Sequence, residues 1–391
     1  MADSGGPNTP WAWLGLLKWS LSYTDGTSPS GEAFQPMSDE DKAFLESVMK
    51  DGIIDEGERM KTILSDMTAA LEQMRNHFDI EGSKSQGDVE DTKNDFPDMK
   101  EEDIVELLHE LQDIVEQIDY ARAFSAMGGL QFLLGCASER DVVPCAIRSS
   151  CLGVLATLCQ NNPPVQDSML NQNSARILAD LYFSELLPEG VGVNEPDGVL
   201  LGKVVQAMSC SIREHAAAEE GFCNEVYGRR VIELGLGLHS RNEMVAKPPT
   251  TLRKRCLFFL YALVTSDTSS IGRVKSFEPC IKHLACNFLD PSLETEFEIR
   301  EMALQLLDQL MKQKRMIDMT VEMKGKIVGL GIRRIKEIRE MEGEDREFAQ
   351  VELDLWESLI VEVARIGALL GHGEDAHAPT EISNPPSLLE G

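Results

Sequence analysis

Beyond residue 103, apolar residues recur at intervals of three and four positions almost to the end of the chain. The first such stretch contains Ile104, Leu107, Leu108, Leu111, Ile114, Val115 and Ile118. This spacing places apolar side chains along one side of an α-helix, and the alternating β-branched runs typical of strands are absent from the sequence. Pairs of Gly or Pro at 128–129, 163–164 and 248–249 interrupt the pattern. The sequence therefore predicts an all-α protein built from many short helices.

An internal repeat is also visible. Segment 118–127 can be aligned with segment 160–169, an offset of 42 residues, which is within the length of an armadillo or HEAT unit. A basic residue stands near the start of four predicted helices: Arg148, Lys203, Arg255 and Arg300. Single units of this kind cannot bury their apolar stripes alone, so they stack and form a groove. We predict an armadillo-like, right-handed α-solenoid with an N-terminal helical extension and a C-terminal helical cap.

The composition changes along the chain. Residues 1–36 are rich in Gly, Ser, Thr and Pro around one apolar segment, and residues 81–103 hold nine acidic residues but only three basic ones. The predicted organisation is a flexible N-terminal segment at 1–36, N-terminal helices at 37–80, an acidic linker at 81–103, armadillo-like repeats at 104–330, capping helices at 331–371 and a disordered tail at 372–391.

The charge of the chain excludes some classes of partner. The formal net charge is −29, which argues against nucleic acid and against anionic membrane surfaces, because both require clustered Lys and Arg. No run approaches 18 apolar residues, so no membrane span is expected. The nine cysteines form no regular framework, and the short apolar stretch 11–17 lacks a basic region before it. These features predict reduced thiols and a cytoplasmic protein, with nuclear entry left open.

The sequence contains no P-loop, no GxSxG motif, no HExxH motif and no paired CxxC motif. The best metal candidate is Cys280, His283 and Cys286, which could line one side of a helix and offer the soft ligands that zinc prefers. These residues would spread over about 9 Å at ~1.5 Å per residue, which favours buried core residues instead. We therefore expect neither an enzyme nor a cofactor.

Two features indicate binding to another protein. Three of the four tryptophans, Trp11, Trp13 and Trp19, lie in an otherwise polar segment. They would dock either on a partner or on the protein's own N-terminal helices. The recurring arginines offer donors that are common in protein interfaces, although each could equally form an ion pair within the chain.

Four motifs resemble one family. Residues 16–21 (Leu-Leu-Lys-Trp-Ser-Leu) with Asp-Gly-Thr at 25–27 look like the N-terminus of the Fes/Sil-type armadillo nucleotide exchange factors, whose animal members are the heat-shock-protein-binding proteins. Three further segments are similar to repeat motifs of that family: Ile118-Asp119-Tyr120-Ala121, Cys159-Gln160-Asn161-Asn162-Pro163 with Val165-Gln166, and Ser211-Ile212-Arg213-Glu214-His215. The second of them matches the family's turn between repeats. The order and spacing make the combination specific, and the chain looks closest to the plant-like cytosolic branch.

The resemblance implies a function. Members of this family are non-enzymatic, cofactor-free partners of heat-shock-70 (DnaK-type) chaperones. Their groove embraces one lobe of the chaperone's ATPase domain, the nucleotide cleft opens, and ADP leaves. We expect this chain to act in the same way, as a monomer. The alternatives are an armadillo adaptor without exchange activity, a metal-dependent enzyme, or a luminal relative, which the missing signal peptide disfavours.

The resemblance also implies roles for particular residues. Ala121 matches a small residue in the groove, and Arg255 matches an arginine that binds the chaperone lobe. Arg148 and Arg213 occupy similar helix positions. The family's N-terminal segment assists substrate release by imitating an apolar client, a role that would fall here to Trp11, Leu16, Leu17, Trp19 and Leu21. The third repeat departs from the family pattern, with Leu201 where an arginine is usual, after a long loop at 185–198.

Overall fold

The computed structural model describes residue 39 and residues 55–83, 99–186, 197–238, 248–315 and 320–374. Every secondary-structure element in these ranges is helical. The chain divides into two compact units, Met1–Asp66 and Met67–Gly391, and the division falls inside α3 (Glu56–Ser83). The first unit is described only at Asp39 and from residue 55 onward, where Met60 and Ile63 are buried.

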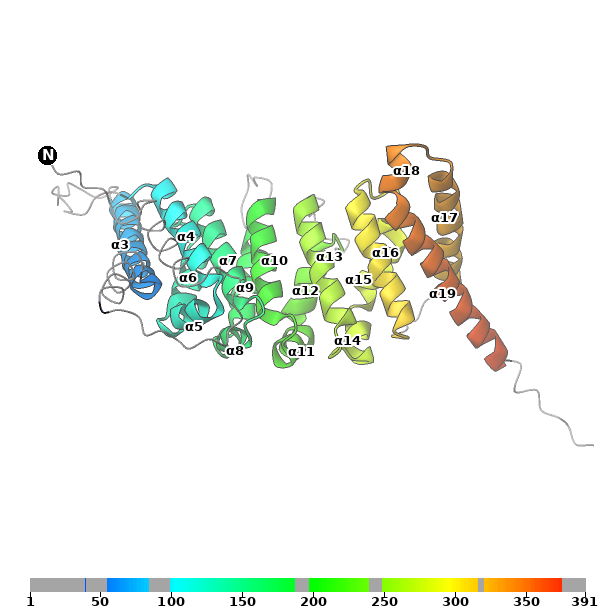
Figure 1. Ribbon diagram of the computed structural model, residues 1–391, viewed down its shortest axis with the longest axis horizontal. Coiled ribbons are helices and arrows are strands. Elements are labelled where there is room, and N and C mark those ends of the chain that lie inside the picture. Colours follow the sequence, from blue (N-terminus) through cyan, green and yellow to red (C-terminus); the bar gives the residue numbers. More distant parts are fainter. Residues whose placement is uncertain are drawn as a thin grey trace, which may run out of the picture. The chain divides into compact units, whose positions relative to one another are not determined.

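The second unit is an array of helices (Figure 1). In chain order they are α4 (Glu101–Val115), α5 (Ile118–Ala126), α6 (Gly129–Ser138), α7 (Cys145–Cys159), α8 (Pro163–Asn171), α9 (Ser174–Leu186), α10 (Gly198–Ile212), α11 (Ala216–Asn224), α12 (Val226–Gly235), α13 (Thr250–Thr265), α14 (Ile271–Ser276), α15 (Glu278–His283) with the π-helical turn η2 (Leu284–Phe288), α16 (Phe297–Lys312), α17 (Val321–Arg339), α18 (Glu344–Phe348) and α19 (Gln350–Glu374).

These helices form triplets in which two shorter helices precede a longer one. The triplets are α5–α7, α8–α10, α11–α13 and α14–α16, and their third helices have 15 or 16 residues. The third helices pack side by side in the order α7, α10, α13 and α16, with α4 on the outer side of α7 (Figure 1). Three helices per unit is the armadillo arrangement. The predicted all-α repeat array is therefore confirmed by the helix triplets of this chain.

The sequence explains where the third helices begin. Pro144 and Pro249 stand directly before α7 and α13, and proline fixes φ near the helical value and has no N–H to leave unpaired. At α10 the carboxylate of Asp197 accepts hydrogen bonds from the backbone N–H groups of Val199 (2.8 Å) and Leu200 (3.2 Å). Such a cap satisfies donors that have no partner inside the helix.

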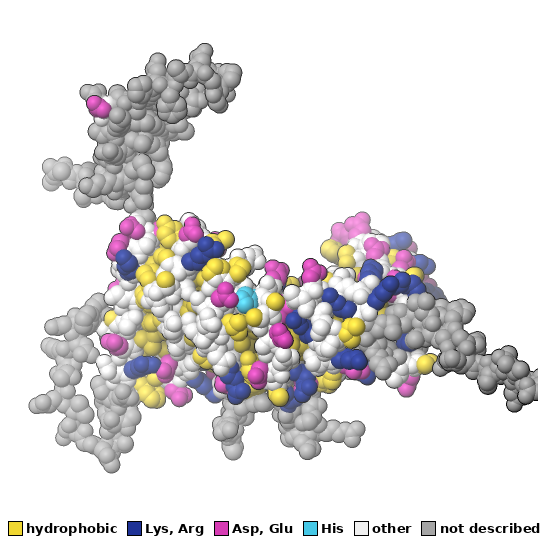
Figure 2. All heavy atoms as spheres, turned by 90° about the horizontal axis from the view of Figure 1, so that it is seen from below, with side chains coloured by type: hydrophobic (Ala, Val, Ile, Leu, Met, Phe, Trp, Pro, Cys, Tyr) yellow, Lys and Arg dark blue, Asp and Glu magenta, His cyan; other side chains and the backbone are white. Residues whose placement is uncertain are grey.

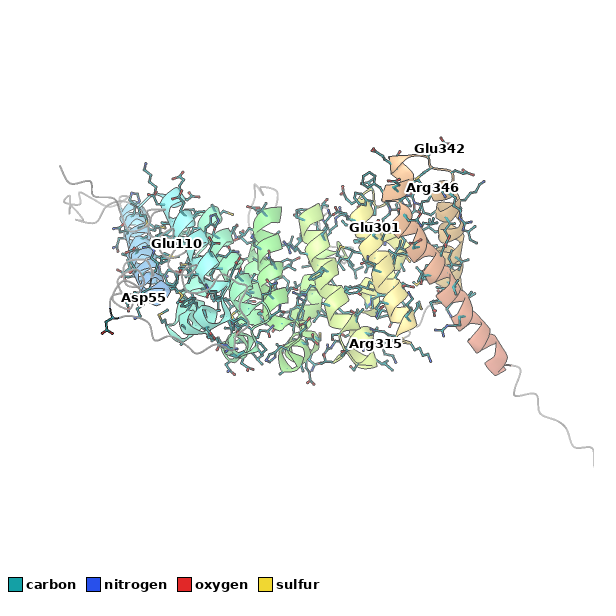
Figure 3. All side chains as sticks on the ribbon, in the orientation of Figure 1. Asp55, Glu110, Glu301, Arg315, Glu342 and Arg346 are labelled. Atoms are coloured by element: carbon teal, nitrogen blue, oxygen red, sulfur yellow. The ribbon has the colours of Figure 1, made fainter. Side chains whose placement is uncertain are left out.

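The third helices end in a recurring turn. Asn161, Glu214 and Lys314 each follow a third helix by two residues and have φ values of 53°, 61° and 54°. This left-handed conformation is uncommon for residues other than glycine, and it ends the helix by redirecting the chain. Side chains then satisfy the last carbonyl groups. After α16, Nη1 of Arg315 donates to the carbonyl oxygens of Val264 and Ser266 (both 2.9 Å), at the end of α13 (Figure 3).

The core lies between the layers of the triplets. In α7, Leu152, Val154 and Leu155 are all fully buried, since neighbouring helices cover most of its circumference. Each such side chain contributes about 1.5–3 kcal/mol relative to an exposed one.

Helices α16, α17 and α19 close the C-terminal end of the array. Trp356 of α19 is fully buried, and a Cβ at Gly331 of α17 would lie 2.7 Å from its ring. Glycine thus permits the close approach of α17 to α19.

The predicted boundaries shift at four places. The helix α3 continues to Ser83, beyond the predicted end of the N-terminal helices at residue 80. The helix α4 begins at Glu101, inside the predicted acidic linker, because acidic residues stabilise a helix N-terminus and Asp103 accepts a hydrogen bond from the backbone N–H of Lys100 (3.2 Å). The predicted border between repeats and cap at 330/331 falls within α17, and α19 extends to Glu374, beyond the predicted start of the tail.

Candidate functional site: the third-helix face

Each third helix, and α4 beside α7, presents the same four positions on the side that is not packed against the array. Counted from the first residue of the helix, they are positions 6, 9, 13 and 16, a spacing that keeps them on one side of a helix. They are Glu106, His109, Asp113 and Glu116 for α4; Ser150, Gly153, Thr157 and Gln160 for α7; Lys203, Gln206, Cys210 and Arg213 for α10; Arg255, Phe258, Ala262 and Thr265 for α13; and Met302, Gln305, Gln309 and Lys312 for α16. We call this surface the third-helix face.

All but one of these residues are exposed or half-buried. The exception is Gly153, over which Lys203 extends: a Cβ at Gly153 would lie 3.5 Å from Lys203 Nζ. The buried positions 3, 4, 7, 8, 11, 14 and 15 hold the core of the array in nearly every third helix. The third-helix face is therefore the surface that remains after packing, and it is available to a partner.

Charge is distributed unevenly over the third-helix face. Its α4 residues include three acidic side chains and its α7 residues are uncharged. Lys203 and Arg213 on α10 and Arg255 on α13 are basic, and Phe258 lies among them. We call these four residues the basic centre. Elsewhere the signs are mixed: in Figure 2, which views the chain from the edge of α5, α8, α11 and α14, Lys and Arg lie interspersed with Asp and Glu.

The cations of the basic centre are not neutralised by neighbours. Within the described ranges, Lys203, Arg213 and Arg255 form no ion pair with a carboxylate. The guanidinium of Arg213 lies over the ring of Phe258, 4.8 Å from its centroid, and Phe258 is 43% exposed. An exposed aromatic ring beside unpaired arginines is typical of the energetic centre of a protein interface.

Of the four predicted groove residues, two lie on the third-helix face and two are buried in the array. Arg213 and Arg255 lie on the third-helix face. Ala121 of α5 is only 1% exposed, so its side chain packs inside the array and does not line an open groove. Arg148 of α7 is 3% exposed; its Nη2 pairs with Glu185 at 2.6 Å and its Nε donates to the carbonyl of Ala137. The intrachain ion pair, one of the two alternatives that the sequence left open, is the observed one for Arg148.

A register difference explains why Arg148 and Arg255 differ. Arg148, Arg253 and Arg300 each stand at position 4 of a third helix, where each is buried. Each pairs with a glutamate: Arg148 with Glu185, Arg253 with Glu294 and Arg300 with Glu352. Arg255 stands at position 6 and is exposed. The sequence grouped Arg148, Lys203, Arg255 and Arg300 as residues near the start of their helices. In the structure, Lys203 and Arg255 stand two positions further along than Arg148 and Arg300.

Leu201 takes position 4 in α10. It is fully buried, so the departure from the family pattern that the sequence showed here affects the core and not the third-helix face. Sequence reasoning also missed Phe258 and Cys210, and it noted Lys203 without assigning it to the site. The signal that could have found Phe258, Cys210 and Lys203 is their position relative to the first residue of their helix.

The remaining candidates are not part of this surface. Trp11, Leu16, Leu17, Trp19 and Leu21 lie outside the described residues. Among the described residues, no group of three or more His, Cys, Asp or Glu is placed to hold a metal ion. In the proposed zinc set, Cys280 is fully buried, which raises the pKa of its thiol to about 12. Within the same ranges, no helix combines the length and apolar character that crossing a membrane needs.

Comparison with known proteins gives a partial picture. No family model matches the chain, and no curated protein matches it. Among solved structures, an engineered protein from the Northeast Structural Genomics Consortium has a TM-score of 0.45 and 12% identity, covering 68% of this chain and 91% of that one.

Two designed armadillo repeat proteins are also similar. The first has a TM-score of 0.43 and 11% identity, covering 67% of this chain and 96% of that one. The second, in complex with the peptide (KR)4, has a TM-score of 0.41 and 12% identity. It covers 67% of this chain and 95% of that one. These scores are low, so the assignment rests on the triplets: the chain is an all-α protein of armadillo-like helical repeats.

Proposed function

We propose that the protein is a binding scaffold whose third-helix face holds a protein partner, and that this partner is the ATPase domain of a heat-shock-70 chaperone. The observation that carries the first part is the unpaired basic centre on a chain with a net charge of −29. An acidic protein that exposes unpaired cations and an aromatic ring on one surface is suited to a partner with acidic groups, since charge complementarity favours encounter and excludes wrong partners.

The second part depends on the family resemblance. Its repeat motifs fall at equivalent places in the array: residues 118–121 begin α5, residues 159–163 join α7 to α8, and residues 211–215 join α10 to α11. These turns border the third-helix face at the ends of α4, α7 and α10. The resemblance therefore concerns the same part of the array that carries the basic centre.

Exchange activity requires unequal binding of two chaperone states. The scaffold must bind the open ATPase domain more tightly than the closed one, by about 1.4 kcal/mol for each tenfold change in the population of the open state. Reciprocity then requires ADP to weaken the complex by the same factor. The scaffold needs no contact with the nucleotide.

The test is stopped-flow release of a fluorescent ADP analogue from a purified chaperone, with and without the full-length protein. The wild type should accelerate release, and Arg255→Ala combined with Lys203→Ala should reduce the acceleration at least tenfold. Arg365→Ala is the matched control, because Arg365 is exposed on α19 and pairs with Glu362 at 2.7 Å. If the double variant accelerated ADP release as much as the wild type, the third-helix face would be excluded as the binding site. If the wild type bound the chaperone without accelerating ADP release, the protein would be an adaptor.

A further inference from the structure

A pocket of about 360 Å³ lies at the end of the third-helix face between two helix turns. Its walls come from the turn between α7 and α8, which includes Asn161, and from the last turn of α10, which includes Cys210, Arg213 and Glu214. Both turns contain a residue in the left-handed conformation, Asn161 and Glu214, so they have the same shape in successive units. The pocket thus lies between equivalent turns of two successive units, and it opens beside the basic centre.

Arg213 is held in a fixed position at this pocket. Its backbone N–H donates to the carbonyl of Ser209 (3.0 Å), and its carbonyl accepts from Nε2 of Gln166 (3.0 Å), which also donates to the carbonyl of Cys210 (2.9 Å). The guanidinium stacks on Phe258. Stacking orients the plane of the guanidinium, whose N–H donors lie along its edge. One side of this edge contacts the thiol of Cys210.

One donor of this pocket has no partner. Nε of Arg213 is buried and has no hydrogen-bond partner. A buried donor without a partner is costly, so native structures seldom contain one unless a ligand or water completes it.

The charges around the pocket favour an anionic ligand. Arg213 and Arg255 both act on the thiol of Cys210, and burial nevertheless raises the pKa of this thiol, so it contributes no negative charge near neutral pH. Glu214 is the one carboxylate in the pocket wall, and it is exposed and forms no ion pair with Arg213. The edge of a guanidinium fits a carboxylate, which accepts two parallel N–H bonds from it.

We propose that this pocket is a subsite that receives the carboxylate of one Asp or Glu side chain of the bound protein, with Arg213 as its main ligand. The subsite deepens the proposed function, on which it rests for the statement that the carboxylate belongs to a protein partner. Its volume of about 360 Å³ is sufficient for one acidic side chain with accompanying water. The partner must therefore present an acidic side chain at the end of its contact with α10.

The experiment measures the pocket without any chaperone. Binding of N-acetyl-glutamate N-methylamide to the full-length protein is followed by saturation-transfer NMR at neutral pH and low salt, with N-acetyl-glutamine N-methylamide as the uncharged probe. The glutamate probe should bind at least fivefold more tightly than the glutamine probe. Arg213→Gln should remove this preference.

Two further variants keep the result interpretable. Arg176→Gln is the matched control: Arg176 also lies over an aromatic ring, that of Tyr227 (5.5 Å), but its guanidinium already pairs with Asp180 (3.0 Å), so the preference should remain. Glu214→Gln removes the one repelling carboxylate and should tighten binding of the glutamate probe about two- to threefold. If Arg213→Gln does not fold, the Glu214→Gln variant still tests the subsite.

Equal binding of the two probes by the wild type, or an undiminished preference in Arg213→Gln, would overturn the subsite. So would an unchanged affinity in Glu214→Gln. None of these results bears on ADP release, so failure of the subsite is distinguishable from failure of the proposed function. A chaperone that binds and exchanges normally with Arg213→Gln would also overturn the subsite, because the carboxylate is assigned to that partner.

Discussion

Arg253 and Glu294 form an ion pair in which both side chains are buried. Nε of Arg253 also donates to the carbonyl of Pro248 (3.2 Å), so the guanidinium joins the start of α13 to the segment before α16. Removing one partner of such a pair leaves an uncompensated charge in the protein interior, which costs about 3–5 kcal/mol.

Arg253→Ala should therefore lower the free energy of unfolding by about 3–5 kcal/mol, measured by urea denaturation. Arg255→Ala, two residues further along the same helix, is exposed and should change it by less than about 0.5 kcal/mol. Similar effects of the two substitutions would contradict the register that places Arg253 inside and Arg255 outside.

Glu352 makes the C-terminal cap sensitive to acid. Burial favours its neutral form, but hydrogen bonds from Arg334 (2.8 and 3.0 Å) and the charges of Arg334 and Arg300 outweigh burial and hold the pKa of Glu352 below its ordinary value. A carboxylate with a lowered pKa in the folded state contributes stability above its unfolded pKa, and this contribution disappears as the pH falls through the folded value.

The wild type should therefore be more stable than Glu352→Gln at neutral pH, and the difference should shrink as the pH falls below about 4.5, the region in which unfolded glutamate takes up its proton. Urea denaturation of both proteins at a series of pH values measures this difference directly, because the other acidic groups are common to both. A difference that stays constant with pH would exclude the lowered pKa.

At the scale of single helices, α5 shows how far the sequence could predict the site. The sequence placed Ala121 in an open groove, whereas the structure buries it beside the fully buried Phe124. Ala121→Arg should therefore destabilise the whole array by about 3 kcal/mol or more, because it forces a charged side chain into a packed interior.

Ala123→Arg on the same helix is the control, since Ala123 is exposed and its substitution should be nearly neutral. Thermal unfolding of both variants measures the contrast. Wild-type stability in Ala121→Arg would indicate that residue 121 faces solvent after all.

The helices themselves were predictable, because a spacing of three and four residues is a local property that packing only reinforces. Which side of α13 faces the core could not be predicted. Residues 256–264 are apolar at every position, so no period shows that Phe258 faces outward while Phe259 is fully buried.

The same limit applies to Arg253 and Arg255. Two residues on a helix point about 200° apart, so the choice between a core ion pair and a binding residue depends on where α13 begins. That depends on the neighbouring helices as well as on Pro249. The pocket beside Arg213 joins two turns about 50 residues apart, and no single segment of the sequence contains it.

At the scale of the whole molecule, the chain combines a net charge of −29 with an unpaired basic centre. This combination should make association with a partner depend on salt. Exposed charges act over about 10 Å at 0.1 M salt and over about 3 Å at 1 M salt. Their main effect on an interface is on the association rate.

Raising the salt concentration from about 50 mM to about 500 mM should therefore slow association with the partner by at least tenfold, while dissociation changes little. Surface plasmon resonance with the chaperone ATPase domain measures both rates. The variant Lys203→Ala/Arg255→Ala should associate slowly at low salt and respond less to added salt. An equal salt response in wild type and variant would move the electrostatic contact away from the basic centre.

The last turn of α13 is completed by a neighbour: Arg315, which follows α16, donates to its terminal carbonyls, and Nε2 of Gln313 donates to the carbonyl of Thr265 (3.1 Å). If the α14–α16 triplet came apart, the preceding triplet would lose the donors for its own final carbonyl groups. The two triplets therefore share one cooperative transition, and melting from the C-terminal side should spread inward without a stable shortened intermediate.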